Sequence, residues 1–263
     1  MTASTLAVTD SATMLRRNLR RMRRYPSLTL FIAGIPVVLL LLFVYVFGGT
    51  MGAGLGTPVG GREGYLAYVV PGILVITVAG AGQGTAISMA MDITEGIVTR
   101  FRTMAISRTS VLVGHVIGSV IQSMLALAIV VGVAVLIGFR PATGPLEWLA
   151  ATGILALAAL AIAWLCVAMG LASGSVETAS NMPMFLVLLP LLGSGFVPTD
   201  SMPDGLSWFA DNQPFTPVIE TVRGLLMGTP VGDSWLIAIA WCLGLSTVGA
   251  LWAVRQYDRR SLR

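Results

Sequence analysis

The chain of 263 residues contains no lysine, because all sixteen of its basic residues are arginine. A phosphate-binding loop of the Walker type requires a lysine, so the sequence cannot carry a standard ATPase site of that kind. Any ATP that drives the protein must then be hydrolysed by a partner. Histidine is limited to His115, which excludes bis-histidine haem ligation within the chain and a multi-histidine metal site. Cys166 and Cys242 lie in apolar runs and indicate no disulfide framework.

Charge of either sign is also scarce. Charged residues make up 11% of the sequence and hydrophobic residues 56%, whereas a soluble domain carries about 25% charged residues. This composition excludes a water-soluble globular enzyme and predicts an integral membrane protein. The net charge of +4 does not point to nucleic acid, because arginines at a cytoplasmic membrane surface explain it.

Six stretches without Asp, Glu, Lys or Arg are each long enough to cross a bilayer, since about 20 helical residues span its apolar core. The predicted spans are about 28–48, 66–88, 110–139, 148–173, 179–198 and 234–254. The fifth span contains Pro183 and Pro190, so we expect it to bend near its centre. The predicted fold class is an all-α integral membrane protein with one transmembrane domain over residues 1–263.

The arginines predict the orientation of these spans. Thirteen of them precede span one, lie between spans two and three, or follow span six, and only Arg62, Arg140 and Arg223 lie on the other side. The positive-inside rule places the arginine-rich side in the cytoplasm. We therefore expect a multi-pass protein with both termini cytoplasmic, and the absence of lysine suggests a bacterial cytoplasmic membrane.

Two segments at the arginine-rich side show helical periodicity. Residues 11–25 place three apolar side chains on one face and six arginines on the others, which predicts an interfacial helix; a solvated basic leader is the alternative. Residues 92–108 form a connection whose apolar positions recur at helical spacing. These positions are Ile93, Ile97, Phe101 and Met104. Such a ridge favours a helix that docks on a partner, and the alternative is an ordinary connecting helix.

A third segment, residues 200–233, lies between spans five and six on the opposite side. It carries five acidic residues, one arginine and four prolines. Apolar residues from Phe215 to Leu226 repeat at helical spacing, which predicts a short amphipathic helix packed on the outer ends of the bundle. We expect a partly embedded cap there.

Few polar side chains interrupt the spans. Gln83, Gln122 and Asn181 are conspicuous, and both hydrogen bonding between helices and lining of a substrate path are open to them. We expect no ionisable group within the bundle except His115, bonded to a neighbouring helix, and hence no proton relay or ion site. Glycines recur at four-residue spacing in three pairs, 80 and 84, 114 and 118, and 170 and 174, which predicts tight helix packing. A largely apolar interior suits a hydrophobic or amphipathic cargo.

Two segments resemble those of the ABC type-2 exporter permeases, most closely the daunorubicin-resistance type, and the resemblance covers nearly the whole chain. The first is EGIVTRFRTMAISR, residues 95–108, followed by SVLVGH, which is similar to the family's cytoplasmic loop. Ala105 stands where the family often has proline, and His115 where it often has arginine. The second is NQPFTPVIETVRGLLMG, residues 212–228, which is similar to the family's outer segment, with Gln213 interrupting the usual Asn-Pro pair.

The resemblance implies a six-span permease, paired with a second permease and with cytoplasmic ATP-binding-cassette ATPases. ATP and Mg²⁺ would be bound by the ATPase partner, and this chain would hold no cofactor, metal or catalytic residue. The residues implied to contact the ATPase are Glu95, Arg100, Phe101, Arg102 and Arg108. Spans two and five line the path in related exporters, which nominates Gln83 and Phe185 as substrate-path residues.

The expected function is export of a hydrophobic drug, antibiotic or lipid-like molecule through the bilayer. Export of a polysaccharide or glycolipid by a permease of the same fold is the alternative within transport. A membrane anchor subunit of a redox complex is the alternative from a different class, and it has no need of an ATPase encoded beside it.

Overall fold

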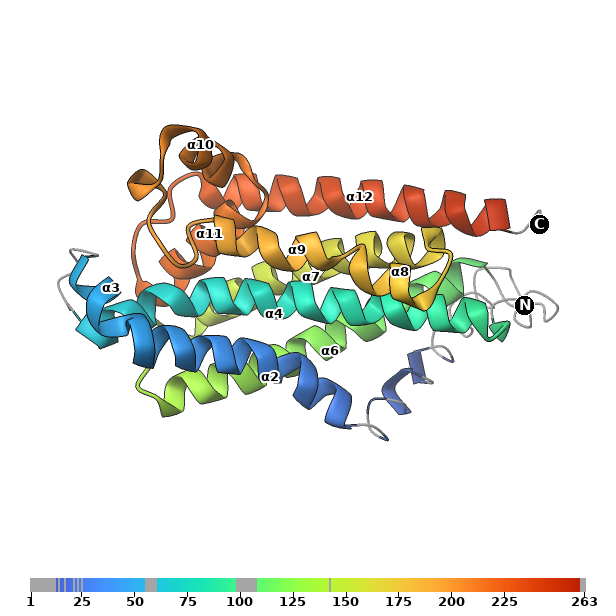
Figure 1. Cartoon of the computed structure of the whole chain (residues 1–263), viewed down its shortest axis with the longest axis horizontal. Coiled ribbons are helices and arrows are strands. Elements are labelled where there is room, and N and C mark those ends of the chain that lie inside the picture. Colours follow the sequence, from blue (N-terminus) through green and yellow to red (C-terminus); the bar gives the residue numbers. More distant parts are fainter. Residues whose placement is uncertain are drawn as a thin grey trace.

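A computed structural model describes most of the chain and is helical throughout the described residues, with no strand among them (Figure 1). The described residues are 26–54, 61–97, 108–141 and 143–260, together with 13, 15–16, 18–20, 22 and 24 of the N-terminal segment. Those N-terminal residues are all helical, within the predicted interfacial helix. The all-α class is therefore confirmed for the part of the chain that can be described.

Among the described residues, five helical segments are long and apolar enough to cross a membrane. The first is a continuous segment of α2 (Pro26–Leu42), the π-helix η1 (Phe43–Phe47) and α3 (Gly48–Gly54). The others are α4 (Gly61–Thr94), α6 (Arg108–Leu136), α7 (Pro145–Ala172) and α12 (Ser234–Arg260). These correspond to five of the six predicted spans, and α4 extends well beyond the predicted limits of 66 and 88.

The predicted span over residues 179–198 is not a single helix. It is divided into α8 (Val176–Asn181), α9 (Met184–Leu188) and the 3-10 helix η2 (Leu189–Leu192). Pro183 is the N-cap of α9, and Pro190 lies in the first turn of η2. A proline supplies no backbone N–H, so each of these positions loses one α-helical hydrogen bond, and here a helical segment ends close to each of them. The broken segment still runs lengthwise beside α4 (Figure 1).

The segment after η2 returns to the bundle through three short helices. These are the 3-10 helix η3 (Thr199–Ser201), α10 (Asp204–Asn212) and α11 (Phe215–Met227). Most of the apolar face of α11 is buried, and the helix packs against α7, α12 and α4. It ends at Gly228, whose φ of 68° allows the left-handed cap.

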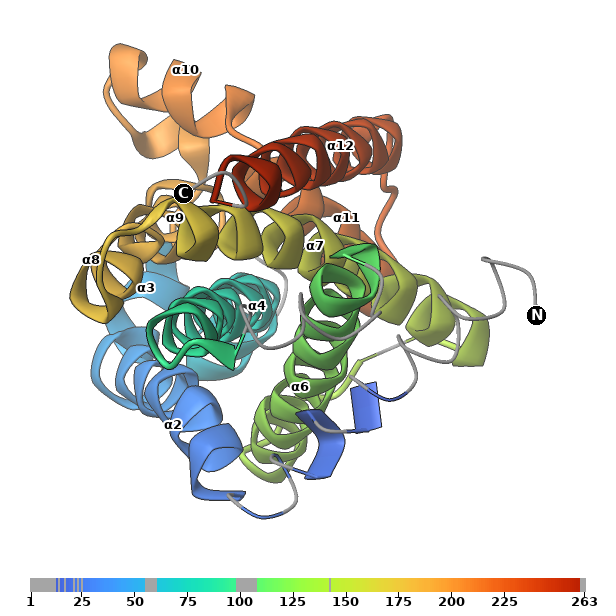
Figure 2. The same ribbon diagram turned by 90° about the vertical axis from the view of Figure 1, so that its right-hand side faces the viewer.

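Helix α4 is the centre of the bundle. Figure 2 looks along the bundle and shows α4 enclosed by α2, α6, α7 and α8, with α12 outside α7. The most apolar stretch of α4 is 83% buried and that of α7 is 78% buried, against 22–33% for the first, third and last spans. A helix that is apolar all round belongs inside a bundle. The remaining spans therefore expose apolar faces to lipid or to another protein.

The predicted glycine pairs differ in what they do. A methyl group on Gly170 would lie 2.6 Å from the carbonyl oxygen of Ala86, so α7 and α4 approach closely there, as expected. Gly80 and Gly174 have no atom within 4 Å of such a methyl group and support no close packing. A methyl group on Gly118 would meet the side chain of Asn18 at 3.0 Å, so this site on α6 receives a side chain and not a helix backbone.

Candidate functional site

The two ends of the bundle differ in charge. The described part of the N-terminal segment, the end of α4, the start of α6 and the end of α12 lie at one end (Figure 1). We call this end the arginine-rich pole, and its described arginines include Arg16, Arg20, Arg24, Arg255 and Arg259. The opposite end, which we call the outer pole, holds α3, α10 and the beginning of α12.

The predicted ATPase-contact residues fall on the connection between α4 and α6. Glu95 is exposed in a turn after α4, where Gly96 has a φ of 69°. Arg100, Phe101 and Arg102 lie outside the described residues, and Arg108 is the first residue of α6. The predicted continuous ridge from Ile93 is wrong at its start, because the left-handed turn at Gly96 separates α4 from the residues that follow.

Asp92 and His115 form a buried pair where this connection leaves the bundle. Asp92 lies in the last turns of α4, and His115 lies two turns into α6. His115 Nε2 is 3.0 Å from Asp92 Oδ2, with side chains 4% and 6% exposed. The expectation that His115 bonds to a neighbouring helix is confirmed. The expectation that the bundle holds no other ionisable group is wrong, because the carboxylate of Asp92 is buried inside it.

Further polar contacts surround this pair at the arginine-rich pole. Asn18 donates through Nδ2 to the carbonyl oxygen of Gly114 at 2.9 Å, which fixes the N-terminal helical segment to α6. Thr85 of α4 donates to Ser119 Oγ of α6 at 2.5 Å. Together with Asp92 and His115, these bonds join three helical segments by side chains.

The predicted substrate-path residues lie on neighbouring segments but make different contacts. Gln83 is half-buried on α4, and its Nε2 donates to the carbonyl oxygen of Ser180 on α8 at 2.7 Å. Phe185 is 51% exposed on α9. Asn181 is exposed on α8, and Gln122 has a buried Nε2 with no hydrogen-bond partner. Gln83 therefore forms a hydrogen bond between two helices, which is one of the two roles that the sequence left open for it.

Arg223 organises the outer pole. Its side chain is 12% exposed. It donates through Nη2 to the carbonyl oxygens of Ser194 at 2.6 Å and Tyr68 at 3.2 Å, and through Nη1 to Glu220 Oε1 at 2.6 Å. The guanidinium carbon lies 3.9 Å from the centroid of the Tyr68 ring, within cation–π distance. One side chain of α11 thus holds α4 and the turn after η2.

At the outer pole, the backbone of α4 also contacts the backbone of the turn after η2. A methyl group on Gly72 of α4 would lie 2.8 Å from both Cα and the carbonyl oxygen of Gly195, so only glycine fits. The Oη of Tyr65 donates to the carbonyl oxygen of Phe196 at 3.3 Å, and the Phe196 ring packs on Phe43 of η1. Residues 194–196 are therefore held by contacts with α4, α11 and the first span.

Sequence reasoning missed the Asp92–His115 pair and the contacts of Arg223. A charge predicts the end of an apolar span, so the sequence places Asp92 in the connection after span two. The available signal was that Asp92 and His115 lie close in sequence, on the two sides of one short connection. For Arg223 the sequence offered a single cation in an acidic segment, but its carbonyl partners have no signature in side-chain patterns.

In the residues that the structure describes, no group of three or more His, Cys, Asp or Glu side chains could hold a metal ion. What the described residues provide is a buried central helix joined at one end to a connection with exposed Glu95 and closed at the other by Arg223.

Comparison with known proteins agrees with this architecture. The chain is 29% identical to the daunorubicin resistance ABC transporter permease protein DrrB1 of Streptomyces coeruleorubidus, over 98% of this chain and 89% of that protein. It is 24% identical to the probable doxorubicin resistance ABC transporter permease protein DrrC of two Mycobacterium tuberculosis strains, over 75% of each chain. The model of the ABC-2 type transporter family matches residues 10–227. The chain therefore belongs to the ABC-2 type transporter family, as a membrane permease.

Proposed function

We propose that this permease exports a hydrophobic drug, antibiotic or lipid-like molecule, with ATP hydrolysed by a cytoplasmic ATP-binding-cassette partner. The observation that carries the proposal is the buried Asp92–His115 pair, which ties α4 to α6 where the connection around Glu95 and Arg108 leaves the bundle. Because α4 is the most buried span, a displacement of that connection acts directly on the bundle centre. The names of the related permeases favour a drug-like cargo.

In this proposal the arginine-rich pole faces the cytoplasm and the chain crosses the membrane six times. The broken segment from Val176 to Leu192 has 17 residues, so it is about 26 Å long if fully helical. With the turn around Gly193 to Val197 it reaches the outer pole as the fifth crossing. Both termini are then cytoplasmic, as the positive-inside rule requires.

The ATPase partner binds the connection at residues 92–108, through Glu95, Arg100, Phe101, Arg102 and Arg108. ATP and its Mg²⁺ belong to that partner. Closure of the ATPase pair moves the connection, and the Asp92–His115 pair makes the ends of α4 and α6 move together. The outer pole, held by Arg223, then opens to release cargo.

A second permease completes the path. The most apolar stretches of the first and last spans are each only 22% buried in one chain, so these helices retain faces for lipid or for the second copy. Gln83 and Phe185 lie on the α4 and α9 side of the bundle, and we assign them to the cargo path. The exposed aromatic ring of Phe185 suits a flat, apolar cargo better than an ion.

Reconstitution tests the cargo and the energy source together. The chain would be co-expressed with the ATP-binding-cassette ATPase encoded beside it, and the purified complex placed in proteoliposomes. We expect ATP-dependent accumulation of doxorubicin, measured by fluorescence, and none with an ATPase that lacks its Walker lysine. Stimulation of ATP hydrolysis by lipid-linked sugars instead of doxorubicin would support the polysaccharide or glycolipid alternative. Co-purification with a redox subunit in place of an ATPase would contradict the proposal.

A paired substitution tests the ATPase contact. Changing Glu95 and Arg102 to alanine removes two charges from the connection, and we expect co-purification of the ATPase to fall about tenfold or more while membrane insertion is kept. The matched control changes Arg140 and Glu147 to alanine, which removes the same two charges at the outer pole. Equal retention of the ATPase and unchanged transport in both double variants would refute the assigned contact.

A further inference from the structure

Six exposed side chains lie on one face of the broken segment from α8 to η2. They are Glu177, Asn181, Met184, Phe185, Leu188 and Leu192. Their positions follow i, i+4, i+7, i+8, i+11 and i+15, which is one side of a helix. The breaks preserve this side, because Met182, Pro183 and Leu188 all keep right-handed helical backbone angles. We call these six side chains the 177–192 face.

The chemistry of the 177–192 face changes along its length. Glu177 and Asn181 are polar and lie at the end of the segment nearer the arginine-rich pole (Figure 1). The other four side chains are apolar, and Phe185 and Leu188 are 51% and 47% exposed. From Glu177 to Phe185 a helix rises about 12 Å. A carboxylate is thus followed, within the length of a drug-sized molecule, by an exposed apolar surface.

The carboxylate of Glu177 is available to a ligand. The cap of α8 does not use it, because the Oγ of Ser175 accepts the backbone N–H of Thr178 at 3.1 Å. Glu177 also has no hydrogen-bond or ion-pair partner among the residues that the structure describes. An exposed carboxylate beside an apolar surface therefore remains as a counter-charge for a bound cation.

The charges around the 177–192 face favour a cation over an anion. Residues 141–222 contain six acidic residues and no arginine, lysine or histidine. Two of the acidic residues, Asp204 and Asp211, are exposed on α10. Figure 2 shows α8, α9 and α10 on the side of the bundle away from α6. Negative charge thus lies toward both ends of this face, and it attracts cations and repels anions.

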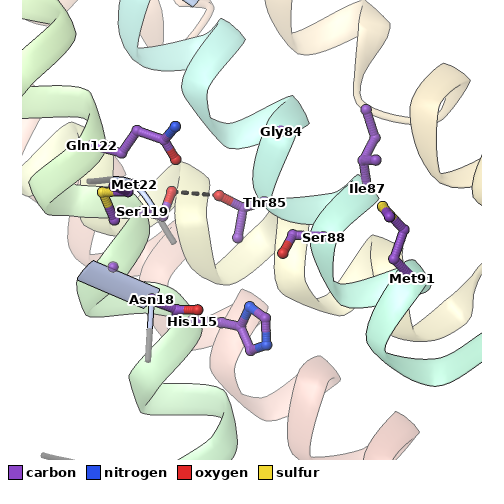
Figure 3. Close-up of a pocket in the computed structure, with 11 residues that line it drawn as sticks. Asn18, Met22, Gly84, Thr85, Ile87, Ser88, Met91, His115, Ser119 and Gln122 are labelled. Carbon is purple, nitrogen blue, oxygen red and sulfur yellow. Dashed lines mark hydrogen bonds between the residues drawn. The ribbon is translucent and has the colours of Figure 1, made fainter. Parts of the chain in front are cut away.

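The cavity on the α6 side of α4 offers a cation no such counter-charge. This cavity lies between the N-terminal helical segment, α4 and α6, and has a volume of about 180 Å³ (Figure 3). Its described lining residues include no aspartate or glutamate. Thr85 faces this side of α4, where it bonds to Ser119. Gln83 faces the other side, where it bonds to the carbonyl oxygen of Ser180 on α8. An amphipathic cation is therefore matched by the 177–192 face and not by this cavity.

We propose that Glu177 is a specificity-determining residue of the cargo path and binds the cationic group of an amphipathic cargo. Met184, Phe185 and Leu188 contact the apolar body of the same molecule. The inference rests on the proposed function, in which this side of the bundle lines the path. A cargo with one basic amine gains an ion pair with the carboxylate, and a neutral molecule of the same shape does not. The cation is held toward the cytoplasmic side and the apolar body deeper in the membrane.

Two probes that differ in charge test the role of Glu177. Doxorubicin carries a basic amine, and N-acetylation removes its positive charge while keeping the ring system. ATP-dependent uptake of each probe would be measured by fluorescence with the complex of permease and ATPase in proteoliposomes. Glu177→Gln should raise KM for doxorubicin about fivefold, as expected for an exposed ion pair, with kcat changed less than about twofold. KM for the neutral probe should not change, and Glu177→Asp should keep most of the preference. Equal changes for the two probes, or none for either, would overturn the proposal.

Matched variants separate the charge from the apolar contact. Glu63 is also an exposed glutamate in the first turn of a helix, but it lies at the outer pole, so Glu63→Gln should leave KM for both probes unchanged. Leu188→Ala removes apolar area and should raise KM for both probes about threefold. Leu243→Ala, at a similarly exposed position of α12, should change neither. The same loss in Glu63→Gln as in Glu177→Gln, or a loss in Leu188→Ala that is confined to doxorubicin, would contradict the assigned contacts.

A thiol introduced on the 177–192 face tests what covers it. Met184 is 53% exposed, and the native Cys166 and Cys242 are buried, so Met184→Cys supplies the accessible thiol. We expect doxorubicin to slow the labelling of this thiol by a maleimide about threefold or more. Disulfide cross-linking between two permease copies, with no protection by doxorubicin, would assign the face to a contact between permeases and overturn the proposal.

Binding without ATP distinguishes this inference from the proposed function. The anisotropy of doxorubicin fluorescence would report binding to the purified complex. Charge-selective binding that depends on Glu177, in a complex that moves no cargo, would leave the cation site standing and refute export. ATP-driven transport that does not distinguish the two probes would do the reverse. A complex that neither binds nor moves either probe would refute both.

Discussion

The two ends of helix α4 are joined to the rest of the bundle in different ways. At the outer pole, Gly72 meets Gly195 backbone to backbone, and Arg223 spans the contact with bonds to main-chain oxygens. At the arginine-rich pole, Asp92 and His115 meet through side chains beside a cavity of about 180 Å³. One end is held by backbone contact and by bonds to main-chain oxygens, and the other is held by polar side chains beside a cavity.

This difference assigns different mechanical properties to the two ends. A backbone contact between glycines cannot loosen gradually, because packed interiors shift between discrete arrangements. Side-chain hydrogen bonds around a cavity can re-form after small shifts. In the proposed function, the outer pole would then be the gate that opens as a unit, and the arginine-rich pole would be the joint that transmits movement.

Removal of Arg223 is expected to have the largest effect on stability. Arg223→Met deletes the bonds to Tyr68 and Ser194 and the contact with the aromatic ring, and we expect a loss of about 3 kcal/mol in the free energy of unfolding. Arg62 is the matched control, since it is exposed at the same pole and lies 4.7 Å from the Tyr45 ring centroid. Arg62→Met should change stability by less than about 0.5 kcal/mol. Similar losses in both variants, measured by denaturant unfolding in detergent, would mean that the Arg223 contacts are not a clamp.

The glycine contact should rank second. Gly72→Ala forces a methyl group against Gly195, so we expect destabilisation of about 2 kcal/mol from overpacking. Gly80 lies on the same helix with nothing within 4 Å of an added methyl group, and Gly80→Ala should be neutral or stabilising by up to about 1 kcal/mol. The same unfolding measurement serves both. If Gly72→Ala is tolerated as well as Gly80→Ala, the outer pole is looser than the contact between the two glycines implies.

The Asp92–His115 pair should affect coupling more than stability. Asp92→Ala leaves His115 without this partner, and we expect a loss of about 1–2 kcal/mol in stability together with more ATP hydrolysed per molecule transported. Asp92→Asn keeps an acceptor for His115 and should restore much of the coupling. Glu63→Ala, at the exposed beginning of the same helix, is the control for a lost carboxylate. A normal ratio of transport to hydrolysis in Asp92→Ala would remove this pair from the coupling route.

The elements that follow from local hydropathy could be predicted from the sequence. Five of the six expected spans are long helices, because their apolar runs exceed the length of the bilayer core. The fifth predicted span was expected to bend near its centre and is instead divided into three short helices, with breaks at Pro183 and near Pro190. Sequence rules therefore located this segment but did not give its internal structure.

The polar contacts could be predicted only in part. A hydrogen bond from His115 to a neighbouring helix was expected, but its partner, Asp92, was placed outside the bundle because its charge was taken to end span two. A buried carboxylate is tolerated there because it is paired, which is a property of the tertiary structure. The contact of Asn18 with Gly118 is also a property of the tertiary structure, because the four-residue spacing of glycines does not specify which group packs against them. The bonds from Arg223 to main-chain oxygens depend on where η2 ends, which no local pattern encodes.

The smallest expected effect concerns Gln213, at the joint between α10 and α11. Its side chain is buried, and neither amide atom has a hydrogen-bond partner. An apolar side chain of similar size removes this unfavourable burial, so Gln213→Met should be neutral or should stabilise the protein by up to about 1 kcal/mol. Thr216→Val is the contrasting control, because the hydroxyl of Thr216 is bonded to the carbonyl oxygen of Ala210, and its loss should destabilise by about 1 kcal/mol. Destabilisation by Gln213→Met of the same size would show that the amide is satisfied by bound water, so the outer pole would be wetter than its glycine contact suggests.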